Sequence, residues 1–112
     1  MRHAARALRA LGPRIILLKG GHLAGTPEST DILDDGQQQI ELPAPRVPTK
    51  NTHGTGCTLS AAIAALLPQR PTPADAIRDA KKYLTTAIAA SDRLTVGAGH
   101  GPVHHFWNWW QT

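Results

Sequence analysis

The chain has 112 residues, 41% of them hydrophobic and 18% charged, which describes one small globular domain and excludes a disordered chain. No apolar run approaches the ~20 residues that a membrane-spanning helix needs, so we expect no membrane partner. The net charge of +4 does not indicate a nucleic-acid partner, because basic and acidic residues fall in separate blocks and no aromatic residues interleave with the basic ones.

The first part of the chain predicts a helix followed by a strand. Apolar residues recur at helical spacing from Met1 to Leu11, and Gly12-Pro13 ends this helix. Residues 15–18 form a short unbroken apolar run, which is typical of a strand buried on both faces of a parallel sheet. Lys19 follows at the carboxyl end of that strand, where open α/β sheets bind their ligands.

The next segment predicts a β-hairpin. Two extended runs, residues 30–33 and 37–42, flank the sequence Asp34-Asp35-Gly36, and an Asp-Gly step between extended runs indicates a tight turn. We expect the two aspartates to lie in a solvated turn. Three prolines between residues 43 and 48 then predict an extended connection.

Two helices are expected in the second half of the chain. The first opens near Cys57 and ends at Pro68. The second begins with Thr72 as its cap and Pro73 at its first position, and runs to about Asp92. Its apolar face comprises Ile77, Ala80, Leu84, Ala87, Ile88 and Ser91. We expect the three tryptophans of the tail to pack against the body of the protein or a partner subunit.

Residues 51–58, Asn-Thr-His-Gly-Thr-Gly-Cys-Thr, carry the most informative pattern. Small residues at Gly54, Thr55 and Gly56 allow a tight turn that leads into a helix. Such a turn binds anions, because unpaired N–H groups and the positive end of the helix dipole meet there. We expect phosphate, with Cys57 beside it. The alternative is an ordinary glycine turn with the cysteine packed beneath the helix.

Residues 51–67 resemble the C-terminal signature of the ribokinase-like superfamily of small-molecule kinases. In that family a Gly-Ala-Gly-Asp turn forms an anion hole, and its Asp is the catalytic base. Here cysteine takes the position of the base, which is similar to the hydroxymethylpyrimidine/phosphomethylpyrimidine kinase branch. The stretch Leu-Leu-Lys-Gly-Gly-His at residues 17–22 and the ending at residues 97–106 agree with the same branch.

The resemblance implies an α/β fold, with residues 1–112 as the C-terminal part of a single ribokinase-like kinase domain, a three-layer α/β/α sandwich. Such kinases are much longer, and the half that supplies most of the sheet and the magnesium motif is expected to be absent. The implied activity is ATP-dependent phosphorylation of 4-amino-5-hydroxymethyl-2-methylpyrimidine and its monophosphate in thiamine biosynthesis. The implied cofactors are ATP and Mg²⁺, and a homodimer is an expected assembly. We expect the chain to be inactive when isolated.

The resemblance also assigns roles in phosphoryl transfer. Backbone N–H groups of Gly54, Thr55 and Gly56 would hold the moving phosphoryl group as its charge spreads. Cys57 would take the proton of the substrate's hydroxymethyl group or phosphate ester, and a helix N-terminus favours the thiolate form that this requires. Whether Cys57 is an essential base or only positions the hydroxyl is left open.

Nucleotide-binding residues are implied in two places. Lys19 would contact the ATP phosphates, and Gly20 and Gly21 would allow close approach of the nucleotide. Asn51 and Thr52 would shape the turn, with phosphate contact as a further role. The alternative for Lys19 is a surface lysine that merely follows a strand.

Other functions stay open beside the kinase. A pyridoxal or pyridoxine kinase of the same superfamily is the close variant, and a non-catalytic remnant or interaction module is the alternative from another class. Histidines and the thiol invite a zinc site, but no CxxC or HExxH pattern supports one, so no metal site is expected. The lone cysteine cannot form an internal disulfide, which is typical of a cytoplasmic protein.

Overall fold

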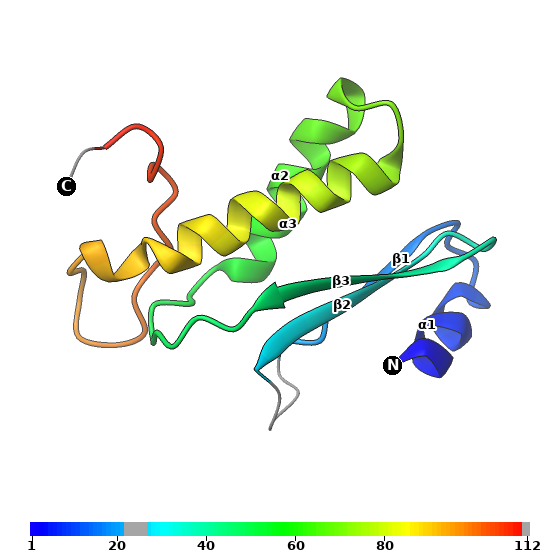
Figure 1. The fold of residues 1–112 in the computed structure, drawn as a ribbon, viewed down its shortest axis with the longest axis horizontal. Coiled ribbons are helices and arrows are strands. Elements are labelled where there is room, and N and C mark those ends of the chain that lie inside the picture. Colours follow the sequence, from blue (N-terminus) through cyan, green and yellow to red (C-terminus); the bar gives the residue numbers. More distant parts are fainter. Residues whose placement is uncertain (22–26, 111–112) are drawn as a thin grey trace. The chain divides into compact units, whose positions relative to one another are not determined.

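The computed structural model describes residues 1–21 and 27–110 (Figure 1). The chain divides into two compact units, Met1–Arg46 and Val47–Thr112. The first unit contains helix α1 and a three-stranded sheet, and the second contains helices α2 and α3. Helices and strands are thus both present, as expected for an α/β chain.

The first unit packs α1 (Arg2–Arg9) against a sheet with the order β1-β2-β3. The strands are β1 (Ile16–Leu18), β2 (Glu28–Asp34) and β3 (Gln39–Pro45), and both neighbouring pairs are antiparallel. The predicted hairpin between β2 and β3 is confirmed. Gly36 has φ +91° in its turn, a conformation that favours glycine.

The prediction of a parallel strand buried on both faces is wrong for β1. This strand pairs antiparallel with β2, with Leu17 opposite Leu33, and all three of its residues are only half-buried. A run of four apolar residues reports burial in a sheet but carries no information about the direction of the neighbouring strand.

The core of the first unit is small. Its fully buried apolar residues are Ala5, Ile32, Leu33 and Leu42. The predicted apolar face of the first helix is only partly used, because Leu8 stays partly exposed and Leu11 lies beyond α1 with 81% of its surface accessible. Ala5 is thus the only fully buried residue that α1 contributes.

Two prolines predicted to lie in an extended connection belong to β3. Pro43 and Pro45 pair with Thr30 and Glu28 of β2. The N–H of Arg46 donates to the carbonyl of Pro27 at 3.1 Å, so the even-numbered positions of β3 direct their N–H groups toward β2. The prolines occupy the alternate positions, and the ladder to β2 therefore loses no donor.

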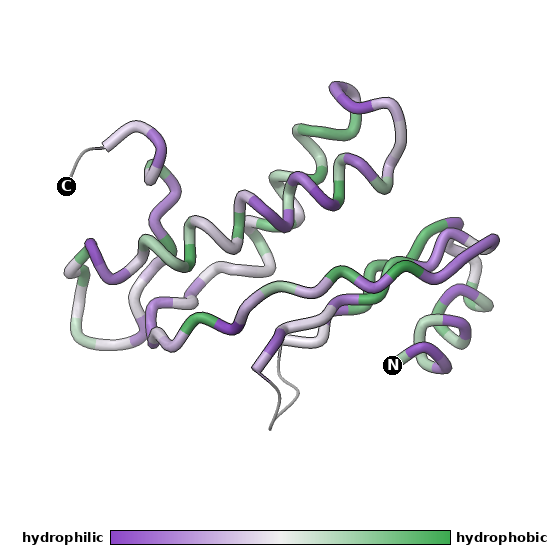
Figure 2. Tube along the Cα trace, in the orientation of Figure 1, coloured by the Kyte–Doolittle hydropathy of each residue, from purple (hydrophilic) through white to green (hydrophobic). Residues whose placement is uncertain are grey.

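The second unit is built on two helices, α2 (Thr55–Leu66) and α3 (Pro73–Ala89), joined through a short 3₁₀ turn, η1 (Leu67–Gln69). Figure 2 shows that α2 is mostly apolar along its length. The predicted start of α3 is confirmed, since the Thr72 hydroxyl accepts the N–H of Asp75 at 3.2 Å and Pro73 is the first residue. The helix ends at Ala89, before the predicted Asp92, and a second 3₁₀ turn, η2 (Ser91–Arg93), follows.

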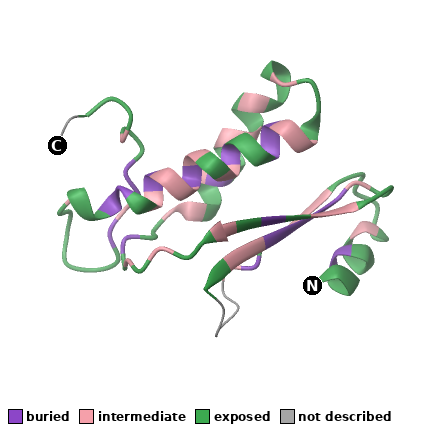
Figure 3. Cartoon of the chain, viewed as in Figure 1, coloured by how far each residue is buried: buried purple, intermediate pink, exposed green. Residues whose placement is uncertain are grey.

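The buried face of α3 packs against α2. Figure 3 shows buried and exposed positions alternating along α3 with the period of a helix. The buried residues of α3 are Ala76, Ile77, Ala80, Leu84 and Ala87. Most of the predicted apolar face is confirmed, and Ile88 is half-buried.

The tail after η2 returns to α3. The N–H of His104 donates to the carbonyl of Ala87 at 3.0 Å, and the Tyr83 hydroxyl donates to the carbonyl of His105 at 2.6 Å. Val103 and His104 are buried, whereas Trp109 is 78% exposed. The tail is therefore fixed to α3 by hydrogen bonds with the main chain of Ala87 and the side chain of Tyr83. At its aromatic end Trp107 is half-buried beside Tyr83, whereas Trp109 and Trp110 are exposed. In the described part of the chain, no helix has both the length and the apolar character needed to cross a membrane.

Candidate functional site

The N-terminus of α2 is an open set of backbone donors. Its cap, Gly54, has φ +80° and ψ 14°, and no side chain caps this end. The first backbone hydrogen bond of the helix runs from Thr58 N–H to the Gly54 carbonyl at 2.9 Å. The N–H groups of Thr55, Gly56 and Cys57 thus precede the first intrahelical bond and are free to meet an acceptor outside the helix.

Cys57 is exposed in the first turn of α2, so the alternative of a cysteine packed beneath the helix is wrong. It lines a cavity of about 790 Å³, which lies in the range of small-molecule sites. All residues of this cavity belong to the second unit: His53, Gly54, Cys57, Thr58, Ala61, Ala62, Leu66, Arg70, Asp79, Tyr83, Pro102 and His105. A small molecule in this cavity has direct access to the thiol.

The cavity has an apolar part on α2 and a polar part formed by Arg70 and α3. Ala61, Ala62 and Leu66 supply the apolar side. On the other side, Nε of Arg70 lies 2.6 Å from Oδ2 of Asp79, so the two charges compensate each other. The ion pair therefore adds no net charge to this wall of the cavity. Sequence patterns did not single out this ion pair, because its members lie nine positions apart and only one of them is on a helix.

Asn51 is buried and turned away from the open N–H groups. Its Nδ2 donates to the Ser91 carbonyl at 3.2 Å and to Oδ1 of Asp92 at 3.1 Å. Both amide hydrogens are thus used within the protein, which agrees with a role in shaping the turn. Thr52 follows on the exposed surface.

Gly101 of the tail lies against the segment that enters the turn. Its carbonyl accepts the N–H of His53 at 3.1 Å, and His53 forms a parallel bridge with Pro102. A Cβ atom at position 101 would overlap Oδ1 of Asn51. Gly101 belongs to the motif at residues 97–106 that carries the family resemblance. The sequence alone did not assign it a role, because its contact with Asn51, 50 positions earlier, is visible only in the structure.

Lys19, Gly20 and Gly21 lie in the first unit, directly after β1. The Lys19 side chain is exposed. The N–H of Gly20 donates to Oδ1 of buried Asp31 at 2.9 Å, and a Cβ at Gly20 would overlap the Thr30 carbonyl. Gly20 is therefore required by its own sheet. The carbonyl of Gly21 accepts from Nη1 of Arg46 at 2.6 Å. His22 of the same motif lies outside the described residues.

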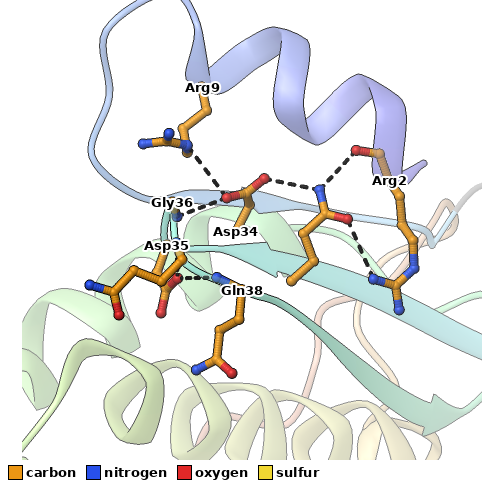
Figure 4. A network of polar contacts seen from close by, with 8 residues as sticks. Arg2, Arg9, Asp34, Asp35, Gly36 and Gln38 are labelled. Carbon is orange, nitrogen blue, oxygen red and sulfur yellow. Dashed lines mark hydrogen bonds and ion pairs between the residues drawn. The ribbon is translucent and has the colours of Figure 1, made fainter.

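The expectation of a solvated aspartate pair is wrong for Asp34, which is only 4% exposed. Its carboxylate accepts from Gln39 Nε2 and from the N–H of Gly36, both at 2.9 Å, and lies 3.5 Å from Nε of Arg9 (Figure 4). The bond from Gln39 and then that from Gly36 lower the pKa of Asp34.

Asp35 remains at the surface of the same turn, where it accepts the N–H groups of Gln37 and Gln38 at 2.9 Å (Figure 4). The bond from Gln38, followed by that from Gln37, lowers the pKa of Asp35. Both aspartates thus stabilise the hairpin as carboxylates.

Within residues 1–21 and 27–110, no three His, Cys, Asp or Glu side chains come close enough together to hold a metal ion.

Comparison with known proteins places the chain in a family. The family model described as phosphomethylpyrimidine kinase matches residues 1–104. The chain belongs to this family. It is 51% identical over 111 residues to the hydroxymethylpyrimidine/phosphomethylpyrimidine kinase of Rhizobium meliloti (strain 1021), covering 99% of this chain. It is 50% identical over 110 residues to the kinase of the same name from Escherichia coli (strain K12), covering 98% of this chain. It spans 41% of the length of each relative.

A solved structure supports the same family fold. The pyridoxal kinase from Staphylococcus aureus in complex with AMP-PCP and pyridoxal matches with a TM-score of 0.86 at 30% identity. The match covers 94% of this chain and 38% of that chain. The α/β class and the ribokinase-like fold expected from the sequence are confirmed.

Proposed function

We propose that the chain forms part of an ATP-dependent kinase that phosphorylates 4-amino-5-hydroxymethyl-2-methylpyrimidine and its monophosphate in thiamine biosynthesis. One observation carries the proposal: the uncapped N-terminus of α2 and the exposed thiol of Cys57 meet at a single cavity. The 51% identity to a relative named as this kinase supports the choice of reaction.

The backbone of the turn provides electrostatic stabilisation. As the terminal phosphoryl group of ATP moves to the acceptor, negative charge spreads over its oxygens. The N–H groups of Thr55, Gly56 and Cys57 and the positive end of α2 are fixed before the reaction, so they offset this charge without reorganisation. Gly54 and Gly56 keep the approach to these N–H groups open, since neither carries a side chain.

Cys57 acts as the base for the acceptor. Its thiolate takes the proton of the acceptor hydroxyl, or of the phosphate ester when the monophosphate is the acceptor, while that oxygen bonds to phosphorus and the bond from phosphorus to ADP breaks. The apolar wall of the cavity holds the acceptor ring beside the thiol. Thr52, exposed ahead of the turn, supplies a hydroxyl for the transferred group.

Lys19 supplies positive charge for the ATP phosphates, and Gly20 and Gly21 shape the backbone that follows it. The exposed ammonium group is compatible with this role. When bound, ATP would supply the phosphoryl group and Mg²⁺ would offset its charge. The described residues offer no cluster of ligands for that ion, and we assign none of them to it.

A pyridoxal kinase is the second candidate, since the matching Staphylococcus aureus structure is that of a pyridoxal kinase. Identity favours the pyrimidine: the chain is 51% identical to a named pyrimidine kinase and 30% identical to this pyridoxal kinase. Both reactions place a hydroxymethyl group on an aromatic ring beside Cys57, so they share the mechanism and differ in the acceptor.

Phosphoryl transfer is testable in a chimera, because the chain spans only part of its relatives. Residues 1–112 replace the matching segment of the Escherichia coli kinase, and ADP release is followed with each acceptor. We expect the hydroxymethylpyrimidine to give a higher kcat/KM than pyridoxal. The reverse order would support the second candidate, and a folded chimera without activity on either acceptor would contradict the proposal.

The same chimera tests the base. Cys57→Ala should lower kcat by about 10²–10⁴-fold, the usual contribution of a positioned base, while the KM for ATP changes little. Cys57→Ser is the matched control, because it keeps the size of the side chain and supplies a weaker base. Wild-type kcat in the alanine variant would refute the role of Cys57.

A further inference from the structure

A polar network lies just before the turn in sequence and joins two separate parts of the second unit, residues 49–51 and η2. Oγ1 of Thr49 donates to Oδ1 of Asp92 at 2.6 Å, and the N–H of Asn51 donates back to the same Thr49 oxygen at 3.1 Å. Nδ2 of Asn51 completes the ring by donating to Asp92 Oδ1 at 3.1 Å. One carboxylate oxygen thus holds both Thr49 and Asn51.

The network holds the segment that directly precedes the turn. Thr49 and Asn51 lie five and three residues before Gly54, whose φ of +80° starts α2. Asn51 and Ser91 are buried, whereas Asp92 is exposed at the outer side of η2. Hydrogen bonds to a carboxylate are stronger than those between neutral groups. Asp92 therefore holds Thr49 and Asn51 in place, and Asn51 in turn positions the backbone that leads into the turn.

Gly101 fixes the other side of the same segment. Its carbonyl holds His53 N–H at 3.1 Å, and the space of a missing side chain is filled by Oδ1 of Asn51. The backbone from Thr49 to His53 is therefore held from both sides immediately before the open N–H groups. All of these contacts are made between groups of the protein itself.

We propose that Asp92 is a positioning residue for the anion-binding turn, acting through Thr49 and Asn51, with Gly101 as the space that Asn51 requires. The proposal rests on the proposed function, because it takes the N–H groups of Thr55–Cys57 as the phosphate site. Asp92 fixes the direction of these groups and touches neither nucleotide nor acceptor.

A matched pair of glycine variants tests the packing side of the proposal. Gly101→Ala places its Cβ on Asn51, whereas Gly99→Ala, two residues earlier, meets nothing within 4 Å. Titration of the chain with ATP, whose terminal phosphoryl group would meet the N–H groups of the turn, should show an affinity about fivefold lower for Gly101→Ala and unchanged for Gly99→Ala, the scale of one lost hydrogen bond.

A second pair tests Asp92 itself. Asp92→Asn keeps an oxygen that accepts from Thr49 and Asn51, and Asp92→Ala removes it. We expect the asparagine variant to restore most of the ATP affinity that the alanine variant loses. Helix content and thermal midpoint, followed by circular dichroism, accompany each variant. If Asp92→Ala lost its helix content, the residue would hold the fold as a whole, and the proposal would be overturned.

The single cysteine supplies a readout that needs no nucleotide. Cys57 is exposed and is the only cysteine of the sequence, so its rate of alkylation by iodoacetamide reports on the surroundings of the thiol at the start of α2. We expect Asp92→Ala and Gly101→Ala to react about threefold more slowly than wild type, and their controls to react at the wild-type rate.

The two readouts separate the two proposals. Failure of the wild-type chain to bind ATP would count against the proposed function, and the alkylation rates would still decide the role of Asp92. Equal alkylation rates in all folded variants would overturn the positioning role even where ATP binds.

Discussion

Nε of Arg9 lies 3.5 Å from Oδ1 of Asp34 and joins the end of α1 to the end of β2 (Figure 4). The aspartate also receives hydrogen bonds from Gln39 and Gly36, so one buried carboxylate connects the helix, the strand and the turn. The charge of Asp34 is therefore part of the stability of the first unit, and this stability depends on pH.

Acid should destabilise the chain through Asp34 and Asp35. Both pKa values lie below their ordinary value of 3.8 in the folded protein, so both groups stabilise it above that value. This contribution is lost as the pH falls through the lowered folded values. We expect the thermal midpoint to drop between about pH 5 and pH 2, and to drop less in Asp34→Asn, measured by circular dichroism. An identical pH dependence in that variant would contradict the assignment.

Leu33 is buried and Leu11 is exposed in the first unit, so alanine substitutions at the two positions form a matched comparison of stability. Leu33→Ala empties a site that is 1% exposed and should lower the free energy of unfolding by about 2–5 kcal/mol. Leu11→Ala removes the same atoms from a site that is 81% exposed, and should change it by less than about 0.5 kcal/mol. Urea unfolding measures both. Equal effects would show that β2 is not the core of this unit.

Alanine substitutions at Gly54 and Gly56 should change the free energy of unfolding in opposite directions. Gly54→Ala meets no neighbouring atom but must keep φ at +80°, which costs about 1–2 kcal/mol. Gly56 lies inside α2 with open space around it, so Gly56→Ala should stabilise the helix by about 0.5–1 kcal/mol. Chemical denaturation of the two variants gives the comparison. Stabilisation by Gly54→Ala would refute the left-handed cap.

The contribution of the Thr72 cap of α3 to the stability of the chain should be measurable with one pair of variants. Thr72→Ala removes the oxygen that accepts Asp75 N–H and should cost about 1 kcal/mol of unfolding free energy. Thr72→Ser retains the hydroxyl and is the control. The serine variant should unfold near the wild-type urea midpoint, and a shift as large as that of alanine would indicate that the lost methyl group matters instead.

The elements that were predicted correctly are encoded by neighbours in sequence. Thr72, Pro73 and Asp75 form a cap within four residues, and the Asp-Gly step of the hairpin is equally local. The glycine turn before α2 was found for the same reason, although the helix starts at Thr55, two residues earlier than expected. Such signals act before tertiary contacts form, which makes them readable without a structure.

The features that were missed depend on partners far along the chain. Asp34 belongs by its sequence to a solvated turn, and only the approach of Arg9 from α1 and the bond from Gln39 explain its burial. The direction of β1 depends on β2, which no property of Ile16–Leu18 encodes. Asn51 turns inward because Asp92 and Ser91 lie there, about 40 positions away.

The alternating prolines of β3 have a consequence for contacts with other chains. Because the N–H groups of residues 42, 44 and 46 point to β2, Pro43 and Pro45 fall where donors would face the outer edge. An extended peptide that aligned itself along this edge would find no donor at two consecutive pairing positions. The hairpin is thereby a poor template for adding strands, which guards it against aggregation.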